Sequence, residues 1–254
     1  MTDLIVFSVG DNRYAMNIEN VQRIIQSKEL TNIPNAHEYI DGMMSYEDKV
    51  IKVLNFRKLI GMQTYENQLK KLFESLVKAH SDWVGALRIS LETGSEFTKT
   101  FDPHACGLGK WIDSFTAYDD HVVEILNELT EYHKQLHTTG GIAYESRKTD
   151  EKKALNMLNV DIVNIYQHTM GALELFIKEL DIVADSLQKL LIYDDKGTVF
   201  AIKVDSIEDI AHVEESEFKT SASEDDVNAF LELDAVLDLH DVLVNVIKTV
   251  KLPR

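Results

Sequence analysis

The spacing of apolar residues changes twice along the chain, and these changes limit the folds that the chain can adopt. Near both ends, apolar residues occur in short, partly alternating runs that are typical of strands. Between roughly Asn67 and Gln188 they instead recur every three or four residues, which is the period of helices that bury one face. A helical segment therefore interrupts a β-rich host, and the predicted fold class is α+β.

Both ends carry the pattern of β-hairpins. Near the start, strand-like runs at 4–9 and 14–18 flank a stretch rich in turn residues. Near the end, runs at 190–193 and 199–204 flank a second such stretch. Each pair predicts two antiparallel strands joined by a tight turn.

Neither end is long enough to close a sheet comfortably by itself. We therefore predict that residues 1–62 and 189–254 are two halves of one β-domain, interrupted by residues 63–188. The interrupting segment holds three long amphipathic runs and one short run around Cys106, which predicts a four-helix bundle.

Four residues of the predicted bundle form a donor set for a metal ion. His80 and His133 fall on the apolar stripes of their helices, and His137 lies one helical turn beyond His133. Cys106 is the single cysteine of the chain. A buried imidazole without a partner costs roughly 1–3 kcal/mol, so histidines at such positions need a ligand or a hydrogen bond. Three imidazoles and one thiolate complete the tetrahedral set that Zn²⁺ prefers.

Other side chains could replace one of these ligands. His104 lies two residues before Cys106, in a predicted loop after a proline, and His121 begins the second long helix. Both rank lower because neither falls on an apolar stripe. Glu131 is assigned to the solvated face of its helix.

Composition excludes several classes of function. The formal net charge of -17 repels phosphate backbones and anionic lipid headgroups, so nucleic acid and membrane surfaces are poor partners. A lone cysteine forms no internal disulfide, and no apolar run reaches the ~20 residues that cross a bilayer. The start of the chain lacks the pattern of a secretion signal. We therefore expect a cytoplasmic protein.

The bundle resembles a known family. The motifs that carry the resemblance are His80-x-x-Trp83, Cys106-x-Leu108-Gly109-x-Trp111 and His133-x-x-x-His137. In order and spacing they are similar to the signature of the chemoreceptor zinc-binding (CZB) domain. The resemblance implies that the three histidines and the cysteine ligate zinc. It also implies that the zinc-bound cysteine responds to zinc level or to oxidants such as hypochlorous acid.

The two ends resemble a second family, the CheW-like adaptors. The similar stretches are Leu4-Ile5-Val6-Phe7-Ser8-Val9-Gly10-Asp11-x-x-Tyr14-Ala15-Met16-x-Ile18-x-x-Val21, Ile33-Pro34-Asn35-Ala36-x-x-Tyr39-Ile40-x-Gly42 and Ala201-Ile202-Lys203-Val204-Asp205-Ser206-Ile207. The resemblance implies a small double β-barrel that bridges chemoreceptors to the histidine kinase CheA.

This chain departs from the adaptor pattern at several positions. Glu47-Asp48 stands where the family commonly has arginine-glycine, Lys52 replaces a proline and Ala201 replaces a glycine. The arginine position is linked in the family to partner contact, and a reversed charge there reverses the local electrostatic complementarity.

The sequence predicts a signalling adaptor with an inserted zinc sensor, and no enzymatic activity. Its expected partners are CheA, chemoreceptors or both, and a homodimer formed through the bundle is a further candidate assembly. A zinc hydrolase is disfavoured because catalytic zinc keeps one position for water and no hydrolase motif is found. A structural zinc bundle on an interaction module outside chemotaxis is the remaining alternative.

Overall fold

The structure is a computed structural model that describes residues 1–117, 119–220 and 229–253. It divides into two compact units. Met1–Tyr65 and Ala184–Arg254 together form one unit, which we call the β-domain, and Glu66–Val183 form the other, which we call the helical unit. The insertion of a helical segment into an α+β chain is thereby confirmed. The domain boundaries predicted from the sequence stay predictions.

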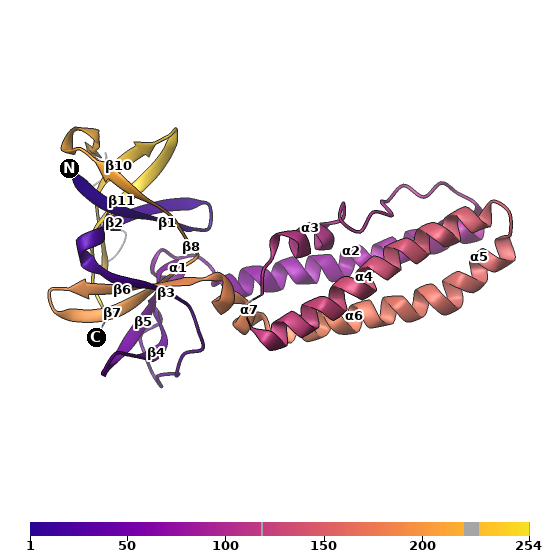
Figure 1. Cartoon of the computed structure of the whole chain (residues 1–254), viewed down its shortest axis with the longest axis horizontal. Coiled ribbons are helices and arrows are strands. Elements are labelled where there is room, and N and C mark those ends of the chain that lie inside the picture. The colour runs from indigo at the N-terminus through magenta and orange to yellow at the C-terminus, as the bar shows by residue number, and fades with distance from the viewer. Residues whose placement is uncertain (118, 221–228, 254) are drawn as a thin grey trace. The chain divides into compact units, whose positions relative to one another are not determined.

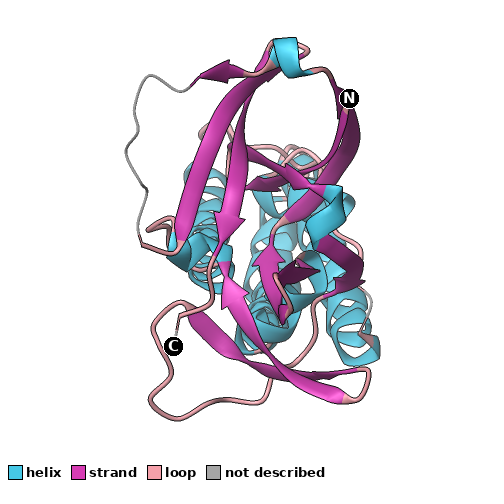
Figure 2. Ribbon diagram, turned by 90° about the vertical axis from the view of Figure 1, so that its left-hand side faces the viewer, coloured by secondary structure: helices cyan, strands magenta, loops and turns pink. Residues whose placement is uncertain are grey.

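The described strands of the β-domain form two sheets (Figure 2). The first has the spatial order β8-β1-β2-β11-β10-β9 and the second β3-β6-β7-β5-β4. The strands are β1 (Thr2–Val9), β2 (Asn12–Asn17), β3 (Val21–Gln26), β4 (Ile40–Tyr46), β5 (Lys49–Asn55), β6 (Lys189–Asp195), β7 (Thr198–Val204), β8 (Ser206–Val213), β9 (Lys219–Thr220), β10 (Leu231–Leu239) and β11 (Val242–Val250). Short helical turns lie at η1 (Ile18–Asn20), α1 (Phe56–Leu59) and η3 (Glu215–Glu217).

Both ends of the chain contribute strands to both sheets. In the five-stranded sheet, β5 pairs in parallel with β7, with Val53 opposite Ala201. In the six-stranded sheet, β2 pairs in parallel with β11, with Arg13 opposite Val244. Parallel neighbours need a long connection, and here the helical unit lies within that connection between β5 and β7. The prediction that both ends build one β-domain is confirmed.

The two predicted hairpins are present. β1 pairs with β2 across a turn in which Gly10 has φ of +60°. β6 pairs with β7 across Lys196 and Gly197, which have φ of +52° and +93°. Successive residues with positive φ match the right-handed twist of the flanking strands, which explains why glycine ends this turn.

Apolar side chains from both sheets share one core. Phe7 of β1 contacts Phe56 of α1, with ring centroids 5.4 Å apart, and Tyr14 of β2 lies 4.9 Å from Phe56. Phe200 of β7 and Leu191 of β6 belong to the same buried cluster. The short helix α1 therefore has a structural role, since its Phe56 and Leu59 side chains belong to the core that the two sheets share.

The helical unit contains three long helical segments and one short helix (Figure 1). They are α2 (Tyr65–Thr93), α3 (Gly107–Ser114), α4 (Asp120–Arg147) and a third long segment made of α5 (Glu151–Met157), a π-helical turn η2 (Leu158–Ile162) and α6 (Val163–Lys178); α7 (Leu180–Leu187) follows. The described helices include none with the length and hydropathy that crossing a bilayer requires.

The third long segment differs from its sequence pattern, which runs unbroken from Leu158 to Leu187. In the structure it begins earlier, because the side chain of Asp150 accepts a hydrogen bond from the Lys153 amide and caps the helix. It widens into a π turn over 158–162 and ends at Lys178. The spacing of apolar residues reports only which face of a helix is buried. It therefore does not reveal the change to π-type hydrogen bonds over 158–162 or the short break after Lys178.

The close approach of α2 and α4 depends on a glycine. Trp83 and Leu87 of α2 share a buried cluster with Leu136 of α4 and Leu158. A Cβ atom added to Gly140 would lie only 2.4 Å from the Trp83 ring. The glycine therefore lets the indole lie directly against the backbone of α4.

We predict that Gly140→Ala lowers the free energy of unfolding of the helical unit by about 1–3 kcal/mol, because the new methyl group overpacks a filled site. Gly171→Ala is the matched control, since no described atom outside its own helical surroundings lies within 4 Å of its added Cβ. That change should raise helix stability by about 1 kcal/mol. Urea unfolding followed by circular dichroism measures both, and equal effects would contradict the packing argument.

Candidate metal centre

Three helices bring the four predicted donor residues together. His80 comes from α2, His133 and His137 come from α4, and Cys106 directly precedes α3. One donor atom of each residue lies within 4.8 Å of the donor atoms of the other three. The heptad-like spacing that put His80 and His133 on apolar stripes also turns them toward each other.

The three histidines are buried and electrically neutral. The exposed fractions are 3% for His80, 2% for His133 and 0% for His137. Burial, with the neighbouring imidazoles adding to it, lowers the pKa of His133 to about 3 and that of His137 to about 4. Burial also lowers the pKa of His80. The rings therefore keep their lone pairs at neutral pH, which is the form that binds a metal ion.

His137 is the residue of the cluster whose ring nitrogens lack hydrogen bonds within the described part of the chain. Among the described residues, neither of its ring nitrogens has a hydrogen-bond partner, although both are buried. Its ring lies 4.8 Å from the Trp83 ring, centroid to centroid. An imidazole buried without partners costs roughly 1–3 kcal/mol. A ligand bound at this point would remove that cost.

The sulfur of Cys106 faces the imidazoles. Its Sγ atom lies 3.1 Å from Nε2 of His133 and 3.9 Å from Nε2 of His80. Burial raises the pKa of the thiol, and the backbone amides of Gly109 and Leu108 oppose that rise. Cys106 is also the N-cap of α3, where its sulfur accepts a hydrogen bond from the Gly109 amide at 3.3 Å. The start of α3 thus fixes the position of the sulfur.

Gly109 makes this local geometry attainable. A Cβ atom at Gly109 would lie 1.8 Å from the carbonyl oxygen of Pro103, so the loop before Cys106 could not pass so close to α3. That loop also brings the Pro103 carbonyl to 3.3 Å from the sulfur. Sequence reasoning included Gly109 only as part of a motif and missed this role, because the contact depends on the backbone path of the loop.

Contacts around the cluster orient its members. Nδ1 of His80 lies 2.8 Å from the carbonyl oxygen of Leu76, which leaves Nε2 facing the sulfur. Nε1 of Trp83 donates to the carbonyl oxygen of Thr100 at 2.8 Å and holds the loop that leads to Cys106. The sequence did not indicate these two partners, because each is a main-chain carbonyl oxygen, a group that every residue carries.

The residues ranked lower lie outside the cluster. His104 is exposed and lies 3.0 Å from the carboxylate of Asp113. His121 is exposed and lies 3.7 Å from Glu179. Glu131 accepts a hydrogen bond from a neighbouring glutamine on the exposed face of α4. The structure therefore brings together His80, Cys106, His133 and His137 and leaves the substitutes apart.

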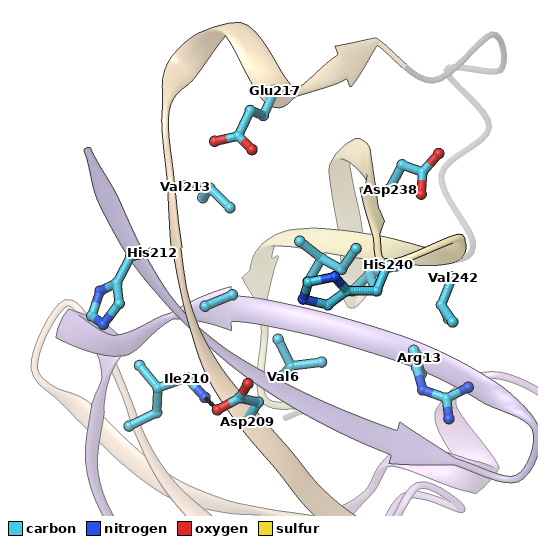
Figure 3. Close-up of a pocket in the computed structure, with 13 residues that line it drawn as sticks. Val6, Arg13, Asp209, Ile210, His212, Val213, Glu217, Asp238, His240 and Val242 are labelled. Carbon is cyan, nitrogen blue, oxygen red and sulfur yellow. Dashed lines mark hydrogen bonds between the residues drawn. The ribbon is translucent and has the colours of Figure 1, made fainter.

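A separate hollow of about 690 Å³ lies in the β-domain (Figure 3). Strand β8 borders it with Asp209 and His212, and the β10–β11 hairpin borders it with Asp238 and His240. None of the clustered donors lines this hollow. Its mixed charges do not form a set of metal ligands among the described residues.

Comparisons with known proteins agree with both resemblances. The family model of the CheW-like domain matches residues 3–87, and that of the chemoreceptor zinc-binding domain matches residues 80–144. The chemotaxis protein CheW of Thermotoga maritima is 20% identical over 76 residues, which are 30% of this chain and 50% of that protein. The match thus spans about half the length of this curated relative.

Among solved structures, the scaffolding protein TtCheW from Thermoanaerobacter tengcongensis matches with a TM-score of 0.45 and 11% sequence identity, over 97% of this chain and 88% of that chain. The CheW-like family model stops within α2, whereas the strand pairing shows that residues after the helical unit complete the same β-domain. All four clustered donors lie within the second matched region. Residues 3–144 of this chain therefore match, in order, the models of a CheW-like domain and of a chemoreceptor zinc-binding domain.

Proposed function

We propose that the helical unit binds one zinc ion through His80, Cys106, His133 and His137. The observation that carries this proposal is that four donor atoms lie within 4.8 Å of one another, and that one of the four residues, His137, has no hydrogen-bond partner among the described residues. Three nitrogens and one sulfur fit the tetrahedral preference of zinc. A full set of four protein ligands favours a non-catalytic site over the zinc hydrolase alternative, because catalytic zinc keeps a position for water.

Local hydrogen bonds already orient two of the proposed zinc ligands. His80 is oriented by the Leu76 carbonyl, and Cys106 is held at the start of α3. When bound, zinc would hold the sulfur as a thiolate and join α3 to α2 and α4. Structural zinc binds small peptides with roughly 10–16 kcal/mol, which is comparable to the ~5–15 kcal/mol stability of a domain. Loss of one ligand could therefore rearrange the unit.

Cys106 is proposed as the sensing residue. It is only partly buried, whereas the three histidines are at most 3% exposed, so a small oxidant meets the sulfur first. The thiolate would attack hypochlorous acid and take up its OH group, giving a sulfenic acid and chloride, with sulfur oxidised and chlorine reduced. The product no longer has the thiolate that binds zinc, so α3 is released. The zinc level would act at the same residue, because it sets the fraction of chains in which Cys106 binds zinc.

We further propose that the protein is a cytoplasmic signalling adaptor of the chemotaxis type. The CheW-like domain supports this role, with CheA, chemoreceptors or both as partners. The change in the helical unit would alter those interactions. Nucleic acid and membrane surfaces are not proposed as partners, because the net charge is -17. A homodimer through the helical unit remains part of the proposal.

One observation favours a second candidate function. Glu47 and Asp48 form the exposed turn between β4 and β5, and Glu47 has φ of +51°. Two carboxylates at the tip of a hairpin present negative charge where the resembling family has arginine. A structural zinc bundle on an interaction module that serves a partner outside chemotaxis fits this difference.

Zinc content tests the ligand set. We predict one zinc ion per chain for the native protein and a large loss of affinity for Cys106→Ala, beyond the roughly 10–100-fold that loss of an outer-shell partner costs. His104→Ala is the matched control, because His104 is an exposed histidine two residues away that points to Asp113. Metal analysis after competition with a chelator measures all three. Equal occupancy in the native protein and Cys106→Ala would exclude the sulfur as a ligand.

Oxidation tests the sensing role. We predict that hypochlorous acid adds oxygen to Cys106 and releases zinc at lower doses than those that oxidise the seven methionines. Peptide mass spectrometry and a zinc-sensitive dye follow the two events together. The same treatment of His104→Ala should give the native response. Zinc that stays bound after Cys106 is oxidised would favour the purely structural alternative.

Charge reversal at the hairpin distinguishes the two candidate functions. We predict that Glu47→Arg strengthens binding to CheA or to a chemoreceptor roughly tenfold, because it restores positive charge at the position linked to partner contact. Asp11→Arg makes the same charge change at the β1–β2 hairpin and serves as the matched control. Titration at low and high salt measures the effect. Equal responses of the two variants would favour a partner outside chemotaxis.

A further inference from the structure

The first connection into the helical unit is held by a buried arginine. We call residues 63–65 the first linker; they belong to the β-domain. Arg57 is 1% exposed, and its Nη1 donates to the carbonyl oxygen of Gln63 at 3.2 Å. Its guanidinium carbon lies 4.7 Å from the centroid of the Tyr65 ring, a cation–π contact. A single guanidinium thus contacts both ends of this linker.

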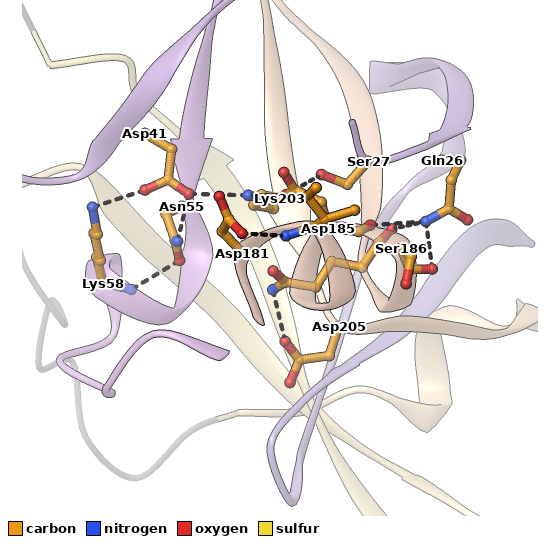
Figure 4. A network of polar contacts seen from close by, with 12 residues as sticks. Gln26, Ser27, Asp41, Asn55, Lys58, Asp181, Asp185, Ser186, Lys203 and Asp205 are labelled. Atoms are coloured by element: carbon orange, nitrogen blue, oxygen red, sulfur yellow. Dashed lines mark hydrogen bonds and ion pairs between the residues drawn. The ribbon is translucent and has the colours of Figure 1, made fainter. Parts of the chain in front are cut away.

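The return connection is held by a glutamine. We call residues 184–188 the second linker; they also belong to the β-domain. Nε2 of Gln26 lies 2.9, 2.8 and 2.7 Å from the carbonyl oxygens of Asp185, Ser186 and Gln188 (Figure 4). The last carbonyls of a helix have no partner within the helix, so Gln26 supplies partners at the end of α7. Lys203 adds an ion pair to Asp185 at 2.6 Å.

One carboxylate joins the two linkers. Asp205 follows β7 and accepts hydrogen bonds from Nε and Nη2 of Arg57 at 2.7 and 2.6 Å. The same carboxylate accepts a hydrogen bond from Nε2 of Gln188 at 3.1 Å and one from the Gly10 amide at 2.7 Å. It therefore contacts the side chain that holds the first linker, a residue of the second linker and the β1–β2 turn.

We infer that Asp205 is a positioning residue that couples the two linkers, so that loosening of one is passed to the other and to the corner between β7 and β8. The coupling between linkers follows from the shared carboxylate alone. Its use in passing a zinc-dependent change from the helical unit to the β-domain rests on the proposed function.

Stability alone does not account for this arrangement. A buried ion pair often contributes little net stability compared with apolar residues of similar size, because both charges must leave water. What a bidentate arginine–carboxylate pair supplies is fixed geometry. Here that geometry spans segments separated by the whole helical unit, since Arg57 precedes it and Gln188 follows it.

A first experiment tests the coupling without zinc. Gln26→Leu removes the amide that holds the second linker and leaves the Arg57–Asp205 pair in place. Hydrogen exchange of the metal-free full chain should become about fivefold faster at residues 184–190 and also at residues 60–65, because both linkers share Asp205. Gln22→Leu is the matched control on the same strand, where Gln22 makes one exposed hydrogen bond to Asp194. A rise confined to residues 184–190 would overturn the inference.

A second experiment tests transmission. Gln188→Met removes the hydrogen bond to Asp205 and leaves no charge unpaired. In the native protein, removing zinc with a chelator should change hydrogen exchange in the helical unit and in β6–β8. In Gln188→Met, zinc content and the response of the helical unit should be unchanged, while the response of β6–β8 falls by at least half.

The outcomes distinguish the coupling role of Asp205 from the proposed zinc-binding function. A purely structural role of Gln188 would shift the exchange rates of β6–β8 equally with and without zinc, and an unchanged zinc-dependent difference would overturn the transmission role. A native protein that binds no zinc would reject the proposed function. The first experiment would then still decide whether Asp205 couples the linkers.

Discussion

The burial of three imidazoles beside one sulfur is the constraint on which the helical unit depends. His80, His133 and His137 face inward from two helices, and burial keeps all three neutral. A core that held only these rings would contain unsatisfied polar atoms, as the two nitrogens of His137 show among the described residues. Apolar side chains at these positions would make a more stable bundle without any ligand. If the unit binds zinc as proposed, the stability of this core depends on the ion.

The β-domain forms one fold although the helical unit interrupts its chain. Parallel pairing of β5 with β7 and of β2 with β11 joins the two halves of the chain. Polar side chains then fix the points where the chain leaves and returns, namely the buried Arg57 on one side and the half-buried Gln26 on the other. Apolar packing alone would allow these linkers to slide, whereas directed hydrogen bonds specify one position for each.

Much of the candidate site could be predicted because it depends on local periodicity. A histidine at a core-facing position of a helix must turn inward, so His80 and His133 could be placed from spacing alone. The π turn at 158–162 could not be predicted, since it changes backbone bonding while the buried face continues. The contacts of Asp205 could not be predicted for another reason. Its partners are remote in sequence, and no period relates Arg57 to Gln188.

The parallel pairing of β5 with β7 also sets an order of events during synthesis. Strand β5 leaves the ribosome before the helical unit, but its partner β7 is made only after that unit is complete. The contacts within the helical unit are closer in sequence and so form sooner. If the helical unit binds zinc as proposed, a nascent chain can therefore capture the ion before the β-domain is complete. Metal supply during translation would then affect how many chains finish the β-domain on a correctly folded insert.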